Sequence, residues 1–101
     1  MATFALLTRL SPEALTRPDS VSDLNKKVTE RIQRDCPAVK WLGNYAVLGP
    51  FDYLDIFEAP DVETATKVAL IIRSLGHAQT ETWALTPWDR YERLAGELNK
   101  K

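Results

Sequence analysis

Residues 4–10 and 51–59 have the length of β-strands, and each carries apolar side chains at both odd and even positions. Successive side chains of a strand point to opposite faces, so a sheet with one face in water shows alternating apolar and polar residues. The two segments break this alternation, because Ile56 falls on one face whereas Tyr53 and Phe57 fall on the other. Both faces of the predicted sheet therefore need a cover.

The spacing of apolar residues and the positions of proline and glycine predict the remaining helices and strands. Apolar residues at helical spacing between Ser20 and Pro37 predict a helix, since serine is a good N-cap and the residue before a proline is pushed out of the helical region. A strand over residues 39–48 reaches Gly49-Pro50, which predicts a β-hairpin with residues 51–59. The remaining expected elements are a helix after Asp61 that ends at Gly76, a strand over residues 79–85, and a helix that begins at Thr86-Pro87.

The expected order is βαββαβ followed by a C-terminal helix. Right-handed crossovers fold this order into a four-stranded antiparallel sheet with the first two helices on one face, the ferredoxin-like α+β arrangement. A chain of 101 residues suffices for one such core, so we expect residues 1–101 to form a single domain. In this topology the strands at 4–10 and 51–59 lie in the centre of the sheet.

The second face of the sheet predicts self-association. We expect Tyr53 and Phe57 on the face that the first two helices leave uncovered, where they would form a larger apolar patch than monomers usually expose. A homodimer packed sheet against sheet, or a higher homo-oligomer, would bury this patch. The alternative is that the C-terminal helix folds back and covers the second face itself.

Asp55 shares the parity of Tyr53 and Phe57, so we expect it at the same interface, near the middle of a central strand. A buried carboxylate without a partner is costly. Arg9 on the neighbouring strand is the first candidate partner, and Asn44 across the hairpin is another. The predicted interface set is Arg9, Tyr53, Asp55 and Phe57.

Composition excludes several classes of function. The 13 basic and 14 acidic side chains are interspersed, so there is no basic stripe for nucleic acid. No apolar run is long enough to span a membrane, and the N-terminus does not resemble a signal peptide. The single cysteine, Cys36, cannot form an internal disulfide, so together with the N-terminus it predicts a cytoplasmic protein. One cysteine and one histidine, distant in the sequence, do not form a metal-site pattern, so we expect no metal and no cofactor.

Three stretches carry a family signature: L-G-P-F-D at the hairpin, E-A-P-D at the end of the next strand, and S-L-G-H-A-Q-T-E-T after the second helix. The chain resembles the GYD-domain family of small bacterial and archaeal proteins from its first strand to its last helix. Phe51 stands where that family usually has tyrosine. The matching positions are Leu48, Gly49, Asp52, Glu58, Ala59, Pro60, Asp61, Ser74, Leu75, Gly76, Thr80 and Thr82.

The resemblance implies a ferredoxin-like fold related to the dimeric α/β barrels. Because the family consists of bacterial and archaeal proteins, it also implies a prokaryotic source. Relatives by fold include cofactor-free monooxygenases, lactone isomerases, haem-degrading enzymes and plain ligand binders, so the fold does not select an activity.

A few polar residues are candidates for chemistry. Asp52 and Tyr45 would be diagonal neighbours on one face of the hairpin, close enough for a hydrogen bond, although an aspartate at a turn more commonly binds backbone amides. His77, at the entrance to the fourth strand, is the natural proton shuttle, although a solvated loop histidine is the commoner case. The predicted ligand-binding residues are Trp41, Tyr45, Asp52, His77 and Trp83.

These candidates favour a small homo-oligomeric ligand-binding or accessory protein, with a pocket between sheet and helices for a small apolar ligand. The alternative is a cofactor-free monooxygenase- or isomerase-like enzyme that uses Asp52, Tyr45 or His77 as acid or base. A purely structural subunit is the third hypothesis.

Overall fold

The computed structural model describes residues 1–12, 18–76 and 78–99 of the chain. The expected βαββαβ order with a C-terminal helix is confirmed. His77 lies outside the described residues. The described elements are β1 (Ala2–Leu10), α2 (Pro18–Asp35), β2 (Lys40–Ala46), β3 (Tyr53–Ala59), α3 (Val62–Gly76), β4 (Ala78–Leu85) and α4 (Trp88–Leu98).

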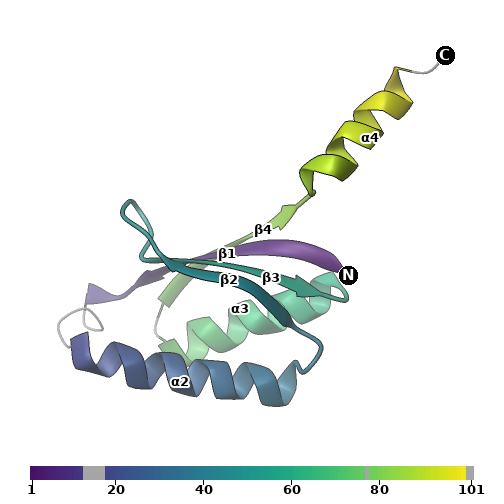
Figure 1. The fold of residues 1–101 in the computed structure, drawn as a ribbon. Coiled ribbons are helices and arrows are strands. Elements are labelled where there is room, and N and C mark those ends of the chain that lie inside the picture. The colour runs from purple at the N-terminus through teal and green to yellow at the C-terminus, as the bar shows by residue number, and fades with distance from the viewer. Residues whose placement is uncertain (13–17, 77, 100–101) are drawn as a thin grey trace.

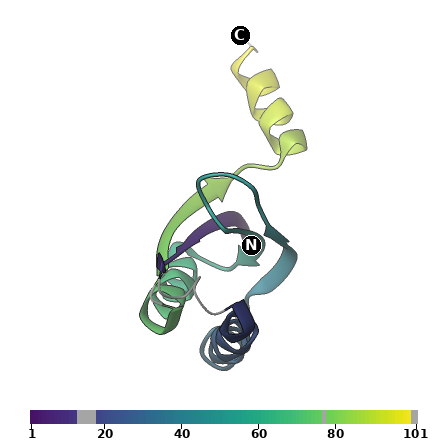
Figure 2. The ribbon, with the colours of Figure 1, turned by 90° about the vertical axis from the view of Figure 1, so that its left-hand side faces the viewer.

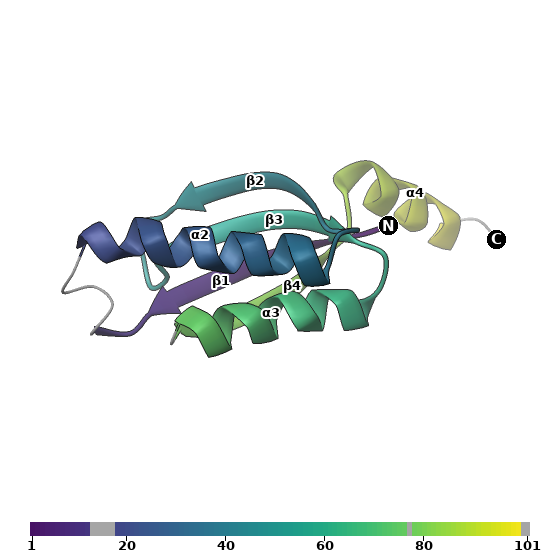
Figure 3. The same ribbon diagram turned by 90° about the horizontal axis from the view of Figure 1, so that it is seen from below.

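The strands form one antiparallel sheet in the order β2-β3-β1-β4, so β1 and β3 are the central strands, as expected. The helices α2 and α3 lie side by side on the same face of this sheet (Figures 1 and 3). In the β1–β3 register, Phe4 lies opposite Phe57 and Leu6 lies opposite Asp55. This is the ferredoxin-like α+β fold that the order of elements predicts.

The core lies between the sheet and the two helices. Phe57 is completely buried; its ring stacks on Phe4 at 5.6 Å between centroids and meets Trp41 at 5.4 Å with a tilt of 56°. From the helical side, the apolar stripe of α2 contributes Ile32, and α3 contributes Val68. Burial of such large side chains contributes roughly 1.5–3 kcal/mol each, so this layer holds the helices on the sheet.

The structure corrects the expected location of Tyr53, Asp55 and Phe57. They do share one face, as their parity predicts, but it is the face covered by the helices, because Phe57 is part of the core. The prediction that they form a patch on the uncovered face is wrong. Of the expected interface set, only Arg9 lies on the uncovered face, at the exposed end of β1.

The uncovered face, which we call the open face, is nevertheless apolar at its centre. Across the sheet, Trp83 on β4, Ala5 on β1 and Ile56 on β3 form one row. The next row places Leu7 beside Leu54, with Tyr45 of β2 at the edge. Trp83 is 49% exposed and Tyr45 is 55% exposed, so aromatic side chains flank the open face.

The helix α4 does not fold back onto this face. It continues outward beyond the end of β4 (Figures 1 and 2), and none of its residues is buried. Pro87 holds the connection in an extended conformation, with φ −55° and ψ 145°. The apolar stripe of the helix is thus left in solvent. Its large members are Trp88, Tyr91, Leu94 and Leu98, between 51% and 87% exposed.

No helix in the described ranges combines the length and the apolar character that a membrane crossing needs.

Candidate functional site

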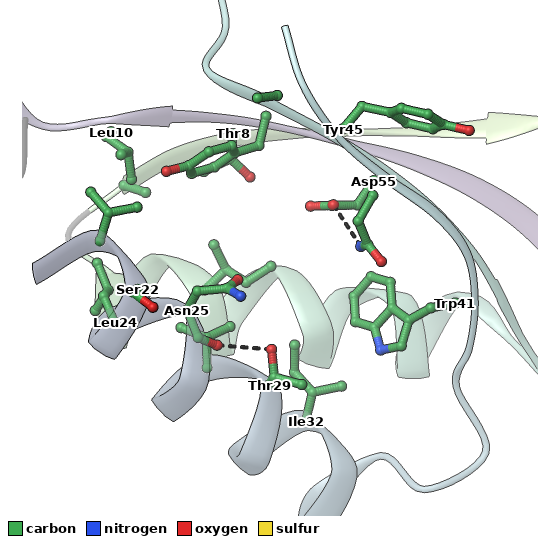
Figure 4. A pocket seen from close by; sticks show the side chains of 17 residues that line it. Thr8, Leu10, Ser22, Leu24, Asn25, Thr29, Ile32, Trp41, Tyr45 and Asp55 are labelled. Atoms are coloured by element: carbon green, nitrogen blue, oxygen red, sulfur yellow. Dashed lines mark hydrogen bonds between the residues drawn. The ribbon is translucent and has the colours of Figure 1, made fainter. Parts of the chain in front are cut away.

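A cavity of about 680 Å³ lies between α2 and the covered face of the sheet (Figure 4). Apolar side chains from α2, including Leu24 and Val28, line one wall. The opposite wall comes from the sheet and includes Trp41, Tyr53 and Asp55. A volume of this size and a mainly apolar lining with a few polar groups are typical of small-molecule sites.

Asp55 is the acidic residue among the described residues that line the cavity. Its position on β3, between Tyr53 and Phe57 on the same face, turns the carboxylate toward α2. The side-chain amide of Asn44, the residue directly opposite on β2, donates a hydrogen bond from Nδ2 to Asp55 Oδ1 at 2.7 Å. Of the two partners that the sequence suggested, the structure selects Asn44.

Desolvation raises the pKa of the Asp55 carboxyl above its usual range, and the hydrogen bond from Asn44 offsets only part of this effect. The neighbouring Tyr53 also has a raised pKa, first because of burial and then because of the negative charges of Asp52 and Asp55. Tyr53 therefore keeps its proton at neutral pH and can donate a hydrogen bond.

Arg9, the other suggested partner, is on the far side of the sheet from Asp55. Its Nε donates to the carbonyl oxygen of Pro50 at 2.7 Å, and its guanidinium carbon lies 5.1 Å from the centre of the Phe51 ring. Arg9 thus holds the β2–β3 hairpin against the end of β1.

Asp52 reinforces the same connection. Its Oδ2 accepts a hydrogen bond from the amide of Leu10 at 2.8 Å, and its own amide donates to the carbonyl of Thr8 at 2.8 Å. We use the term hairpin lock for these contacts between the end of β1 and the β2–β3 turn: those of Arg9 with Pro50 and Phe51, and those of Asp52 with Thr8 and Leu10. The carboxylate of Asp52 binds a backbone amide, as aspartates near turns often do, but the amide is across the sheet and not in the same turn.

The structure does not bring the predicted site residues together. Trp41 and Tyr45 both border the cavity, but Tyr45 pairs with Leu54, so its ring lies on the open face. Trp83 is also on the open face, opposite Ala5. Within the described chain, Asp52 and Tyr45 form no hydrogen bond with each other, and the acid/base arrangement expected of an enzyme is not assembled there.

The polar residues that α2 contributes to the cavity are not among those predicted from the sequence. Asn25 and Thr29 lie one turn apart beside the apolar stripe, and Thr29 Oγ1 donates to the Asn25 carbonyl at 2.8 Å. The side-chain amide of Asn25 makes no hydrogen bond within the described ranges, so it is available to a ligand. In the sequence, Asn25 and Thr29 are two polar residues next to the apolar stripe of the helix. The same pattern occurs at the edge of the apolar face of any surface helix, so it does not by itself indicate a binding site.

The described residues contain no group of three or more histidine, cysteine, aspartate or glutamate side chains that could hold a metal ion. Cys36 is buried at the end of α2, and desolvation raises the pKa of its thiol. Such a thiol packs as a small apolar side chain and is a poor nucleophile.

We predict that Asp52→Ala destabilises the fold by about 1–3 kcal/mol, because it leaves the amide of Leu10 without its acceptor. The matched control is Asp89→Ala, which removes an exposed carboxylate on α4. Urea unfolding monitored by circular dichroism measures both. If the two variants have the same free energy of unfolding, the Asp52 carboxylate does not stabilise the fold through the hairpin lock.

We predict that Asp55→Asn stabilises the protein at pH 7. A carboxyl whose pKa is raised on folding favours the folded state while it is protonated, and this stabilisation is lost as the pH rises from the unfolded-state pKa through the folded-state pKa. The amide cannot ionise, and its oxygen can still accept the bond from Asn44. We expect Tm to rise at pH 7, and a change of even about 1 kcal/mol would be measurable, since it shifts Tm by roughly 4–8 °C in a domain of this size.

The measurement is differential scanning calorimetry from pH 4 to pH 8. The advantage of Asp55→Asn over the unmodified protein should grow as the pH rises. A lower Tm for the variant at pH 7 would show that the carboxylate stabilises the fold, against this account.

Comparison with known proteins identifies relatives over most of the chain. The GYD domain family matches residues 4–95. The "Glutamine synthetase and cystathionine beta-lyase binding protein" of Thermus thermophilus is 31% identical over 87 residues, which cover 86% of this chain and 90% of that protein.

Solved structures support the fold. The Leucine response regulatory protein (LrpA) of Mycobacterium tuberculosis has 13% identity and a TM-score of 0.57 over 85% of this chain, but the match spans only about half (51%) of LrpA. The de novo designed protein Foldit4 has 18% identity and a TM-score of 0.56, with coverage of 85% of this chain and 97% of the design. At these identities the likeness concerns the fold alone.

The family match extends over residues 4–95, and the structure gives Asp52 of the hairpin signature a role in joining the hairpin to β1. The chain therefore belongs to the GYD domain family.

Proposed function

We propose that this protein is a small, single-domain, homo-oligomeric accessory protein of the prokaryotic cytoplasm that binds other proteins, and that its cavity takes a small ligand. The observation that carries this proposal is the similarity to the T. thermophilus binding protein, which extends over nearly the whole of both chains. Glutamine synthetase and cystathionine β-lyase are therefore the first partners to test.

Two unpartnered apolar surfaces support binding through association. The first is the open face, with Trp83 and Tyr45 at its sides and Ile56 near its centre. The second is the stripe of α4, which includes Trp88 and Tyr91, with rings stacked at 5.2 Å. On the open face the exposed apolar side chains are Trp83 and Tyr45, while the central Ala5 and Leu7 are buried. Exposed apolar side chains that gather on one surface mark interaction sites in soluble proteins.

A second copy of the chain is the partner that fits both surfaces at once. Each copy offers one open face and one projecting helix, so a two-fold dimer can place the α4 stripe of each protomer against the open face of the other. A stable interface between two proteins buries about 1,200–2,000 Å² in total, and the two equivalent contacts of α4 with the open face would contribute to this area together. The proposed homodimer thus still uses the face opposite the helices, although the residues on that face are different from those first expected.

The enzyme hypothesis has less support. Asp52 uses its carboxylate to hold the backbone of Leu10, and Tyr45 borders the cavity but directs its ring to the open face of the sheet. A general base needs to reach the proton that it removes in a plausible pose of the substrate. Neither residue faces the one cavity described above, so we place an acid/base role second to binding.

We predict that the purified protein binds glutamine synthetase or cystathionine β-lyase from the same source, with the α4 stripe as part of the assembly. Leu94→Glu should weaken binding at least tenfold, because it puts a charge in the middle of the apolar stripe. Gly96→Glu is the control, since Gly96 is on the opposite side of α4 and an added Cβ there meets no atom within 4 Å.

Biolayer interferometry with the immobilised protein measures each affinity. Binding of neither enzyme at micromolar concentration would overturn the proposed partners. Equal loss of binding in the two variants would show that the added charge acts through something other than the α4 stripe.

A further inference from the structure

Among the described residues that line the cavity, Asp55 is the one carboxylate. Asp55 Oδ1 accepts the bond from Asn44, an uncharged amide, and no described residue donates a hydrogen bond to Oδ2. None of the described residues that line the cavity is basic. A partly desolvated negative charge is costly until a cation or further donors compensate it.

Aromatic rings border the same part of the cavity. Tyr53 lies two residues from Asp55 on the same face of β3, and Trp41 lies beside Phe57 on the neighbouring strand. The faces of tryptophan and tyrosine rings attract organic cations, and more strongly where water is excluded. A carboxylate with two aromatic neighbours is thus suited to an ammonium group.

The α2 wall offers a further acceptor and an apolar surface. Figure 4 shows Asn25 on α2 and Asp55 on β3 at opposite walls of the cavity. The side-chain oxygen of Asn25 can accept a hydrogen bond, and an alkylammonium ion has three to donate. Leu24 and Val28 supply the surface against which an aliphatic chain would pack.

We propose that this cavity is a binding site for a small organic ammonium ion with a short apolar tail. The ammonium group pairs with Asp55 between the rings of Trp41 and Tyr53, and the tail lies along Leu24 and Val28. The inference rests on the ligand-binding part of the proposed function and adds the charge and chemical class of the ligand. It does not depend on whether the protein binds glutamine synthetase.

Three probes of nearly the same shape separate charge from apolar contact: 3-methylbutylamine, 3-methylbutan-1-ol and 3-methylbutanoate. Each is titrated into the full-length protein in phosphate buffer at pH 7.5, and amide shifts are followed by ¹⁵N–¹H NMR. We expect the amine to bind at least tenfold more tightly than the alcohol, with shifts at Asn44, Asp55 and Asn25. We expect no binding of the carboxylate.

Asp55→Asn tests the assigned residue. It should lose amine binding at least tenfold while its Tm at pH 7 is not lowered, so a loss of binding cannot be attributed to unfolding. Asp89→Asn, an exposed aspartate on α4, removes the same charge at a distance and should bind the amine as the unmodified protein does.

The outcomes distinguish this inference from the ligand-binding role on which it rests. Equal affinity for amine and alcohol would overturn the ammonium assignment and leave an apolar ligand site in place. Amine binding that persists in Asp55→Asn would also overturn the assignment. No binding of any of the three probes at millimolar concentration would overturn both the assignment and the ligand-binding role.

Discussion

The central strands of this sheet are apolar on both faces, and the rest of the structure depends on how each face is covered. On one face, α2 and α3 bury Phe57, Leu6 and their neighbours in a conventional core. On the other, Ile56 and Leu54 are only partly covered within the chain, while α4 extends into solvent with an unpaired apolar stripe. A chain with two such exposed surfaces is suited to association, and its likeness to a protein-binding relative agrees with this property.

The signature at the hairpin has a structural explanation. Asp52 accepts from the amide of Leu10, and Arg9 reaches the carbonyl of Pro50 and the ring of Phe51. These contacts join the β2–β3 turn to the end of β1, where the regular pairing of the central strands stops. Phe51 can make the ring contact without a hydroxyl, so the replacement of the family's usual tyrosine leaves the hairpin lock intact.

Periodicity predicts the fold but not the direction in which a side chain faces. The order of elements and the α2 stripe ending at Ile32 and Cys36 follow from apolar spacing, and the structure confirms them. The alternation of side chains along β3 correctly places Tyr53, Asp55 and Phe57 on one face of the sheet. It does not indicate which of the two faces the helices cover, so it could not show that these residues lie under the helices. The hydrogen-bond partner of Asp55 could not be chosen from the sequence for the same reason. Asn44 lies on the same face of the sheet as Asp55, whereas Arg9 lies on the opposite face. The apolar spacing of α4 in the sequence is the same whether the helix packs on its own sheet or on the sheet of a partner, so the spacing could not predict which of the two it does.

Whether a second copy covers the open face is tested most directly by the mass of the protein in solution, measured by sedimentation velocity from 1 to 200 μM. We predict a main species of about twice the 11.4 kDa of one chain, with reversible dissociation at the lowest concentrations. Trp83→Glu, which places a charge on the open face, should shift the population to single chains. A single 11.4 kDa species across the whole range would contradict the claim that a second copy covers the open face.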